Sequence, residues 1–165
     1  MLTDIVFRSI RETDASSIQN VALEAWRYTY HTIFDQQFIK NFVNRNYAPE
    51  AILALLPRIQ EGSMFFYIAE YESKLIGFCN IGIHNQNAEL FRIYLLPPFI
   101  GQGIGHRLLE LGETFVVDHG INVYSCFVHK DNEIGKQFYL HCGFKHIPEK
   151  DRDDEWFLEK RLPAR

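Results

Sequence analysis

Residues 89–115 read ELFRIYLLPPFIGQGIGHRLLELGETF, and this stretch decides the fold of the chain. Its apolar start predicts a strand that Pro97 ends, and the periodicity after the glycines predicts an amphipathic helix. Gly101, Gly103 and Gly105 alternate where this helix should begin. The first turn of a helix exposes N–H groups without intrahelical partners, and the helix dipole makes this end partly positive. The stretch therefore has the layout of a phosphate cradle, in which glycines let the backbone approach a ligand closely.

Periodicity and turn residues predict the elements around this stretch. Residues 64–69 and 74–83 read as two strands of a hairpin. The strand over residues 121–128 is mostly apolar on both faces, so we expect it to be central in the sheet and covered on both sides. Other strands are expected over residues 5–10, 89–96, 144–147 and 156–162. Helices are expected from a cap at Thr13 or Asp14 to Tyr30, after a cap at Asp35, over residues 48–60 with an end or bend at Pro57, over residues 103–119, and from a cap at Asp131 or Asn132 to Cys142.

The bulk composition bounds the class of protein. The chain has 165 residues, of which 47% are hydrophobic and 23% charged, as expected for a globular domain. The formal net charge is −4 and there is no basic run, which argues against nucleic-acid binding. The order of elements predicts a single α/β domain over residues 1–165, with a mixed sheet covered by helices on both faces.

Cysteine usage and hydropathy indicate the compartment. Cys79, Cys126 and Cys142 are odd in number, form no CxxC pair and lie in or beside apolar segments, which favours buried thiols in a reducing environment. The N-terminus lacks the pattern of a signal peptide, and no apolar run reaches the length of a membrane span. We expect a cytoplasmic protein without membrane association.

Three interpretations compete for the glycine turn. A P-loop requires Lys and Ser or Thr after its last glycine, but His106 and Arg107 follow Gly105. A dinucleotide fold requires a third glycine where this chain has His106, and it usually begins the first βαβ unit. A tight glycine turn without any ligand is the remaining structural alternative.

A second motif decides between these interpretations. Residues 128–144 read VHKDNEIGKQFYLHCGF, and they place Asn132, Gly135, Tyr139 and a Gly-Phe pair about thirty residues after the turn. Together with Leu95-Leu96-Pro97 and the glycine turn, this order resembles the GNAT acyltransferase superfamily over essentially the full length. The resemblance implies a mixed, mostly antiparallel central sheet of about seven strands with helices on both faces.

The resemblance also implies a binding site for acetyl-CoA and no metal. In the family, backbone N–H groups of this turn bind the pyrophosphate and the matching Asn contacts the pantetheine arm. The chain departs from the motif at Ile100, where an Arg or Gln is usual, so the cofactor affinity is in doubt; His106 and Arg107 are candidates to compensate. The cofactor-binding residues implied are Leu95, Gly101, Gln102, Gly103, Ile104, Gly105, His106 and Asn132.

The chemistry implied is direct attack of an amine on the thioester. Tyr139 is the candidate that stabilises or protonates the leaving thiolate, since a phenol can hydrogen-bond to the sulfur. A backbone N–H at the end of the strand, that of Leu95, is implied as the oxyanion donor. Glu89 is the first candidate for the base that deprotonates the amine and His84 the second; both residue types also occur as ordinary surface side chains.

The acceptor is less well defined by the sequence. The pocket is expected near Trp26, Tyr28, Tyr30, Phe34 and Asp35, where aromatic rings beside a carboxylate could hold a cationic amine. Phe127 occupies a position where some enzymes that acetylate protein N-termini carry Glu, which counts against N-terminal alanine.

We therefore expect an acyl-CoA-dependent N-acyltransferase, with acetyl as the acyl group and a small-molecule or peptide amine as acceptor. The alternative is a GNAT-like module that binds or senses CoA without catalysis. A nicotinamide enzyme is a distant third. Either a monomer or a homodimer is compatible with the sequence.

Overall fold

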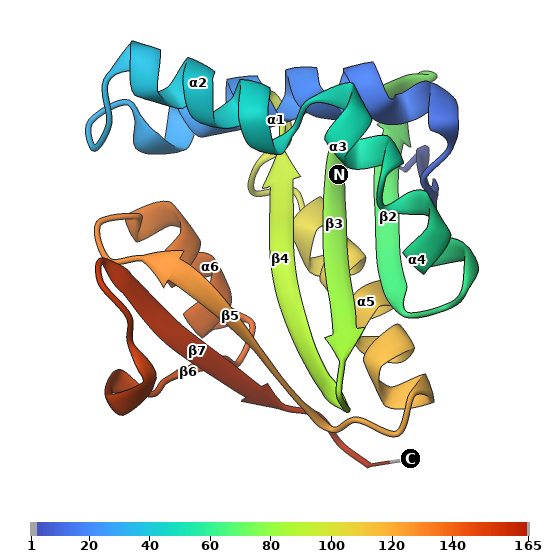
Figure 1. Cartoon of the computed structure of the whole chain (residues 1–165), viewed down its shortest axis with the longest axis vertical. Coiled ribbons are helices and arrows are strands. Elements are labelled where there is room, and N and C mark those ends of the chain that lie inside the picture. Colours follow the sequence, from blue (N-terminus) through green and yellow to red (C-terminus); the bar gives the residue numbers. More distant parts are fainter. Residues whose placement is uncertain (1–2, 165) are drawn as a thin grey trace.

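The computed structural model describes residues 3–164, which form a seven-stranded sheet with helices on both faces (Figure 1). The helices are α1 (Ala15–Tyr30), α2 (Gln36–Asn46), α3 (Pro49–Leu53), α4 (Leu56–Gln60), α5 (Ile104–Asp118) and α6 (Glu133–His141). The strands are β1 (Ile5–Ser9), β2 (Met64–Tyr71), β3 (Lys74–His84), β4 (Asn87–Leu95), β5 (Val123–His129), β6 (Lys145–His146) and β7 (Glu155–Arg161).

The sheet has the order β1-β2-β3-β4-β5-β7-β6. All neighbouring strands run antiparallel except β4 and β5, which are parallel and pair only at Ala88 with Tyr124 and at Glu89 with Ser125. Figure 1 shows β4 and β5 diverging from this contact. The mixed, mostly antiparallel sheet predicted from the sequence is thus confirmed, and its centre opens into a gap.

Two layers of helix cover the sheet. Figure 1 shows α5 and α6 behind the sheet, while α1, α2 and α3 pack together across its upper part. Phe78 and Ile81 lie on opposite faces of β3: the Phe78 ring lies 6.1 Å from that of Tyr47, and Ile81 faces α5. A Cβ at Gly112 would come within 2.5 Å of Ile81 Cδ1, so this glycine allows α5 to approach the sheet closely.

Local turn chemistry fixes the strand pairing. Glu72 and Ser73 both have positive φ between β2 and β3, as do Asn85 and Gln86 between β3 and β4. Two consecutive positive φ values are typical of the hairpin turn whose twist matches that of the flanking strands. The predicted hairpin is confirmed.

The interruption expected at Pro57 is confirmed, whereas Asp14, at the N-cap of α1, makes no side-chain cap. The helix expected over residues 48–60 is interrupted between α3 and α4, because Pro57 has no N–H and its ring clashes with the carbonyl group four residues earlier. Asp14 precedes α1, but its carboxylate accepts from the Arg11 N–H at 2.7 Å and pairs with Arg8 at 2.8 Å. Burial opposes its ionisation, yet these hydrogen bonds hold the pKa of Asp14 below its ordinary value.

Most other predicted features agree with the structure. Asp35 caps α2 by accepting from the Phe38 N–H at 2.7 Å. Cys79, Cys126 and Cys142 are buried free thiols. Strand β5 is central as expected, but the prediction that both its faces are covered is wrong: only alternate residues are buried, because Phe127 and His129 on the other face line a cavity. Within residues 3–164, no helix combines the length and hydrophobicity that crossing a membrane requires.

Candidate active site

The glycine turn before α5 presents free backbone donors. Gly101 and Gly103 both have φ of +84°, a conformation that favours glycine, and α5 begins directly afterwards. The first intrahelical bond runs from the Arg107 N–H to the Gly103 carbonyl at 3.0 Å. The N–H groups of Gly103, Ile104, Gly105 and His106 therefore have no acceptor among residues 3–164 and remain available to an anion.

Space around the turn is open. A Cβ built on Gly101 or Gly103 would meet nothing within 4 Å. The side chain of Gln102 folds back and donates to the Pro98 carbonyl at 3.0 Å, which stabilises the turn. Ile100 is 39% exposed and lines the cavity beside the turn, so its position leaves room for a ligand without offering a charge.

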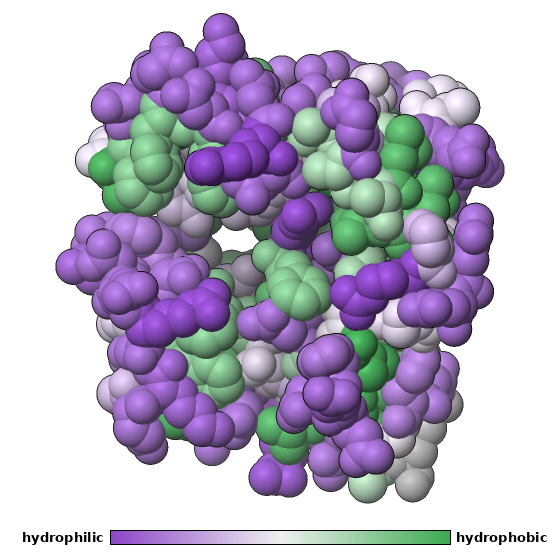
Figure 2. Space-filling view, viewed as in Figure 1, coloured by the Kyte–Doolittle hydropathy of each residue, from purple (hydrophilic) through white to green (hydrophobic). Residues whose placement is uncertain are grey.

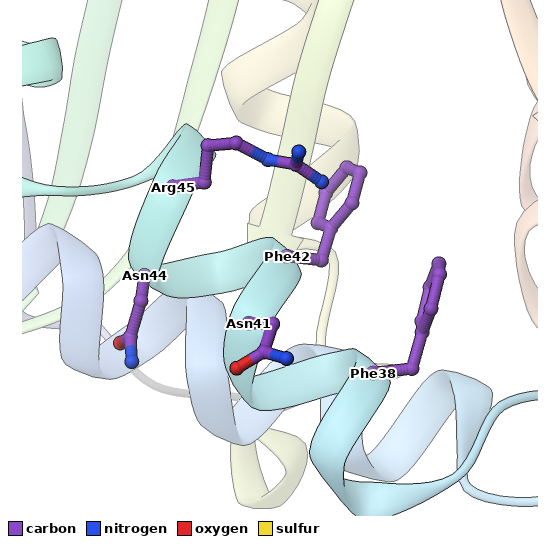
Figure 3. Close-up of a pocket in the computed structure, with 5 residues that line it drawn as sticks. All are labelled: Phe38, Asn41, Phe42, Asn44 and Arg45. Carbon is purple, nitrogen blue, oxygen red and sulfur yellow. The ribbon is translucent and has the colours of Figure 1, made fainter.

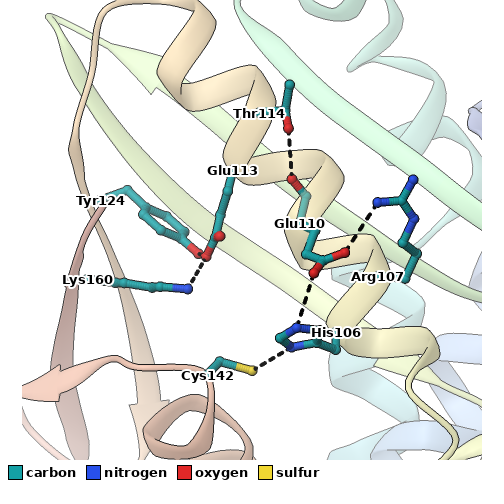
Figure 4. A network of polar contacts seen from close by, with 8 residues as sticks. All are labelled: His106, Arg107, Glu110, Glu113, Thr114, Tyr124, Cys142 and Lys160. Atoms are coloured by element: carbon teal, nitrogen blue, oxygen red, sulfur yellow. Dashed lines mark hydrogen bonds and ion pairs between the residues drawn. The ribbon is translucent and has the colours of Figure 1, made fainter. Parts of the chain in front are cut away.

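The side chains of His106 and Arg107 do not replace the polar group that Ile100 lacks, because both are engaged elsewhere. Figure 4 shows the His106 imidazole between Cys142 and Glu110, at 3.7 Å from Sγ and 3.3 Å from Oε1. Arg107 pairs with Glu110 at 3.2 Å on the exposed side of α5. The His106 backbone N–H stays available, whereas neither side chain is held at the turn itself.

The rest of the network in Figure 4 fixes α5 against the far side of the sheet. The Glu113 carboxylate accepts from the Tyr124 hydroxyl at 2.7 Å and from Lys160 Nζ at 2.6 Å. These contacts join α5 to β5 and β7. They hold the glycine turn in a fixed position relative to the gap between the strands.

Asn132 links three elements around the gap. Its Oδ1 accepts from the Gly135 N–H at 2.8 Å and so caps α6, as the sequence predicts. Its Nδ2 donates to the Tyr30 hydroxyl of α1 at 3.2 Å. A Cβ at Gly135 would lie 2.6 Å from Asn132 Nδ2 and 3.0 Å from Val128 Cγ2, so only glycine fits here. The start of α6 therefore lies close against β5.

A cavity of about 290 Å³ runs between the turn and α6. It occupies the gap where β4 and β5 diverge. Several of the residues predicted to bind the cofactor or act on the thioester line it together: Leu95, Gly101, Gly105, Asn132 and Tyr139, beside Ile100, Gly135 and Phe138.

Tyr139 contributes an unpaired hydroxyl to this cavity. Among residues 3–164 no hydrogen bond is made by its Oη, while its ring packs edge-on against Phe138 and Phe144. Burial raises its pKa well above the ordinary value, and the nearby tyrosine and cysteine groups act in the same direction. The phenol is therefore protonated at neutral pH and acts as a donor.

The end of β4 presents a backbone donor to the same cavity. The Leu96 N–H donates to the Ile76 carbonyl on β3 at 2.8 Å. Successive N–H groups along a strand point to opposite edges, so the Leu95 N–H faces the gap. Because β5 has diverged from β4 there, the Leu95 N–H has no strand partner on that side.

A second cavity of about 670 Å³ adjoins the first. Figure 2 shows an opening on this face of the molecule, below helices α1 and α2 and beside strands β5 and β7, with apolar and polar side chains at its rim. Tyr30, Phe91, Arg92, Tyr94 and Phe127 line both cavities and so mark their junction. A thioester that reaches this junction would be open to a molecule in the second cavity.

Helices α1 and α2 supply an aromatic wall to the second cavity. Trp26 stacks on Phe42 with ring centroids 4.2 Å apart, and Phe34 stacks on Phe38 at 4.4 Å. Figure 3 shows Phe38, Phe42 and Arg45 on one side of α2, with Asn41 and Asn44 on the other. The spacing of 38, 42 and 45 places these three side chains on one helical face.

The predicted acceptor residues separate into two groups. Trp26, Tyr30 and Phe34 line the second cavity. Tyr28 is 46% exposed and Asp35 is engaged as the cap of α2, and neither lines the cavity. The carboxylate expected beside the aromatic rings is thus absent from that position.

The two candidate bases lie in different surroundings. Glu89 is half-buried where β4 and β5 part, and burial raises the pKa of its carboxyl, with Arg152 opposing the shift. His84 is exposed at the end of β3, beside Asn85 at 3.1 Å, and lines neither cavity. Glu89 lines neither cavity either, but its carboxyl lies near Arg152 and Glu155, which line the second cavity.

The sequence analysis missed the four charged residues that line the second cavity: Arg58, Arg92, Arg152 and Glu155. Arg92 lies at the junction, and Glu155 lines the second cavity while paired with Arg152 at 3.2 Å. A charged residue inside the apolar run LFRIYLL was the signal that could have identified Arg92. Among residues 3–164, no cluster of three or more His, Cys, Asp or Glu side chains is arranged to hold a metal ion.

Comparisons with known proteins give one consistent family. The acetyltransferase (GNAT) family model matches residues 17–144. The spermidine N(1)-acetyltransferase of Thermoplasma acidophilum is 31% identical over 161 residues, covering 97% of this chain and 99% of that protein. The crystal structure of the PaiA N-acetyltransferase of T. acidophilum, in complex with coenzyme A, has a TM-score of 0.92 at 30% identity and covers 97% of this chain and 100% of that one. A GCN5-related N-acetyltransferase from Rhodopseudomonas palustris shares the fold, with a TM-score of 0.76 at 13% identity and 98% of each chain covered.

Proposed function

Because the chain belongs to the acetyltransferase (GNAT) family, we propose that it transfers an acetyl group from acetyl-CoA to a primary amine by direct attack in a ternary complex. The family resemblance drawn from the glycine turn and the Asn132–Tyr139 motif is confirmed, and the chain is an N-acetyltransferase of that family. The observation that carries the proposal is the meeting of two cavities at one junction.

The smaller cavity suits the acyl donor. The free N–H groups of residues 103–106 would bind the pyrophosphate, since they are unpaired donors at the positive end of a helix dipole. The close approach that Gly135 permits leaves room for the pantetheine arm between β4 and α6. The coenzyme supplies an activated acetyl thioester, whose leaving group is a thiolate.

Leu95 and Tyr139, which line the smaller cavity, would carry the transfer. The Leu95 N–H would donate to the carbonyl oxygen as negative charge develops on it. Tyr139 would donate its hydroxyl hydrogen to the departing sulfur. Because the pKa of Tyr139 is raised above that of a thiol, hydrogen-bond stabilisation of the thiolate is favoured over complete proton transfer.

The first test combines donor binding with an amine panel. Acetyl-CoA at a hundredfold excess over its Kd should raise the Tm by about 5–10 °C. NAD should cause no shift, and a Tm rise with NAD alone would favour a nicotinamide enzyme. Spermidine, diamines, amino acids and short peptides are then supplied as acceptors while the release of free CoA thiol is measured.

The alternative function is CoA binding or sensing without catalysis. The departure at Ile100 motivates it, and the free hydroxyl of Tyr139 in the cavity weighs against it. Tight CoA binding with no thiol release from any amine of the panel would support the sensing role and contradict acetyl transfer.

We propose Glu89 as the base, acting through water, because its carboxyl lies near Arg152 and Glu155 of the second cavity. A base works when deprotonated, so kcat/KM should rise with pH through the raised pKa of Glu89, and Glu89→Gln should lower activity and remove that limb of the profile. The raised pKa also means that the ionised carboxylate opposes folding above this pKa, so Glu89→Gln should not lower the Tm at pH 7. A pH profile unchanged in Glu89→Gln would exclude this role, and Glu12→Gln, exposed on the turn before α1, is the control.

The remaining proposals concern organisation. We infer one domain over residues 1–165, acting as a monomer or homodimer on a small-molecule or peptide amine, without nucleic acid. The buried free thiols suit a reducing compartment, which supports a cytoplasmic location.

A further inference from the structure

The second cavity carries an excess of positive charge. Arg58, Arg92 and Arg152 line it, with Glu155 as the one carboxylate among its described lining residues. Arg152 is paired with Glu155 and lies 3.6 Å from the centre of the Phe127 ring. Arg58 and Arg92 have no carboxylate within 4 Å among residues 3–164. Because Glu155 is paired with Arg152, the described lining leaves Arg58 and Arg92 without a carboxylate partner.

The protein provides hydrogen-bond acceptors for only part of the Arg92 guanidinium. Its Nη2 donates to the Asn46 carbonyl at 3.4 Å, at the C-terminal end of α2, and its guanidinium lies 4.7 Å from the centre of the Tyr47 ring. A cation at a helix C-terminus is favourable, so this half of the guanidinium has a structural role. Nη1, in contrast, is buried and has no acceptor.

The indole N–H of Trp26 is also buried without an acceptor. Among residues 3–164, Arg92 Nη1 and Trp26 Nε1 are the two buried side-chain polar atoms without a hydrogen-bond partner. The Trp26 N–H is near enough to the Tyr47 hydroxyl to influence its pKa, but its geometry is not that of a hydrogen bond. Both unpaired atoms are donors and both residues line the second cavity.

Buried donors without acceptors are costly, and native proteins rarely keep them without a reason. An oxyanion bound in this cavity would neutralise the guanidinium and supply the kind of acceptor that both residues lack. A guanidinium fork matches a carboxylate or a phosphate, in which two oxygens accept side by side. A polyamine, by contrast, would bring a further ammonium group into a cavity that already carries unpaired positive charge.

We propose that the acceptor of this enzyme is a small amine that also carries a carboxylate or phosphate, which Arg92 and Trp26 bind while the amine points to the junction. This inference rests on the proposed acetyl transfer. It assigns Arg92, at the junction of the two cavities, as the residue that selects the acceptor.

The test compares amines that differ only in the anionic group. The pairs are L-lysine with cadaverine, L-phenylalanine with phenethylamine, and O-phosphoethanolamine with ethanolamine, alongside spermidine. Because the amine pKa differs within a pair, the ratio of kcat/KM for the two members is compared between proteins, so that intrinsic reactivity cancels. The amino acid pairs and the phosphate pair separate the two sources of negative charge.

Arg92→Gln should lower the anionic-to-neutral ratio about 10- to 100-fold, the usual effect of losing a hydrogen bond to a charged group. Arg92→Lys keeps the charge without the fork and should fall between. The matched control Arg27→Gln removes an exposed arginine of α1 and should leave the ratio unchanged. An equal ratio in wild type and Arg92→Gln, or spermidine preferred over every anionic amine, would overturn the inference.

Two further measurements apply if Arg92→Gln does not fold or if no amine is acetylated. If Arg92→Gln fails to fold, Trp26→Phe removes the indole N–H together with one ring of this buried side chain, and it should lower the ratio about 2- to 10-fold, because a general loss of activity cancels in the ratio. If no amine of any class is acetylated, the proposed function fails. The inference is then decided by calorimetric binding of N-acetyl-lysine and N-acetylcadaverine to the CoA complex, and equal affinities would overturn it.

Discussion

Replacing Tyr139 with phenylalanine is expected to lower kcat about 100-fold while the KM for acetyl-CoA stays nearly unchanged. The ring of Tyr139 packs against Phe138 and Phe144, and phenylalanine preserves that packing. Its hydroxyl makes no hydrogen bond within residues 3–164, so the variant loses no contact of the resting protein. The loss should appear only when negative charge develops on the sulfur.

The measurement is steady-state turnover with an acceptor identified from the amine panel. Tyr67→Phe is the matched control, because Tyr67 stacks on Phe65 at 4.5 Å and lines neither cavity. Acetyl-CoA should stabilise both variants as it stabilises the wild type. Turnover of Tyr139→Phe at the wild-type rate would show that the leaving sulfur is stabilised by another group.

Replacing Gly103 with alanine is expected to raise the Kd for acetyl-CoA about 10- to 100-fold. Gly103 has a φ of +84°, so alanine strains the turn that presents the free N–H groups. A Cβ at this position meets no protein atom within 4 Å, and it would project into the space that the pyrophosphate is proposed to occupy. Both effects weaken donor binding, and kcat at saturating donor should change much less.

Gly120→Ala separates ligand binding from backbone strain. Gly120 follows α5 with a φ of +74°, and a Cβ there also meets nothing within 4 Å. Both variants should therefore lower the Tm by similar amounts, while only Gly103→Ala loses the stabilisation by acetyl-CoA. Calorimetric titration of the two variants gives the comparison, and equal affinities would place the pyrophosphate elsewhere.

Much of the fold could be predicted because its signals are local. The strand-turn-helix of residues 89–115 depends on Pro97, which ends the strand, and on Gly101 and Gly103, which adopt the positive φ values of the turn. Asp35 and Asn132 cap the helices that follow them, since a capping side chain needs only the N–H groups two or three residues ahead.

The sequence was less informative where a residue had more than one local role available. Asp35 could have lined the acceptor pocket, but it caps α2 instead. Asp14 could have capped α1 through its side chain, but Arg8 and the Arg11 N–H take its carboxylate. In each case the partner is close in sequence, so neighbouring groups compete for the same carboxylate and a residue pattern does not say which one binds it.

By itself, the sequence determined the family and led to the proposals for the phosphate cradle and for the residues that act on the thioester, because each depends on backbone conformation or helical spacing within a short segment. Only the tertiary structure decided the acceptor cavity. It is assembled from segments far apart in the chain, as the contact of Phe34 with His129 illustrates, whose ring centroids lie 5.3 Å apart. The charge of that cavity, and with it the proposed role of Arg92, depends on which distant side chains fail to reach a partner, and no local pattern encodes this.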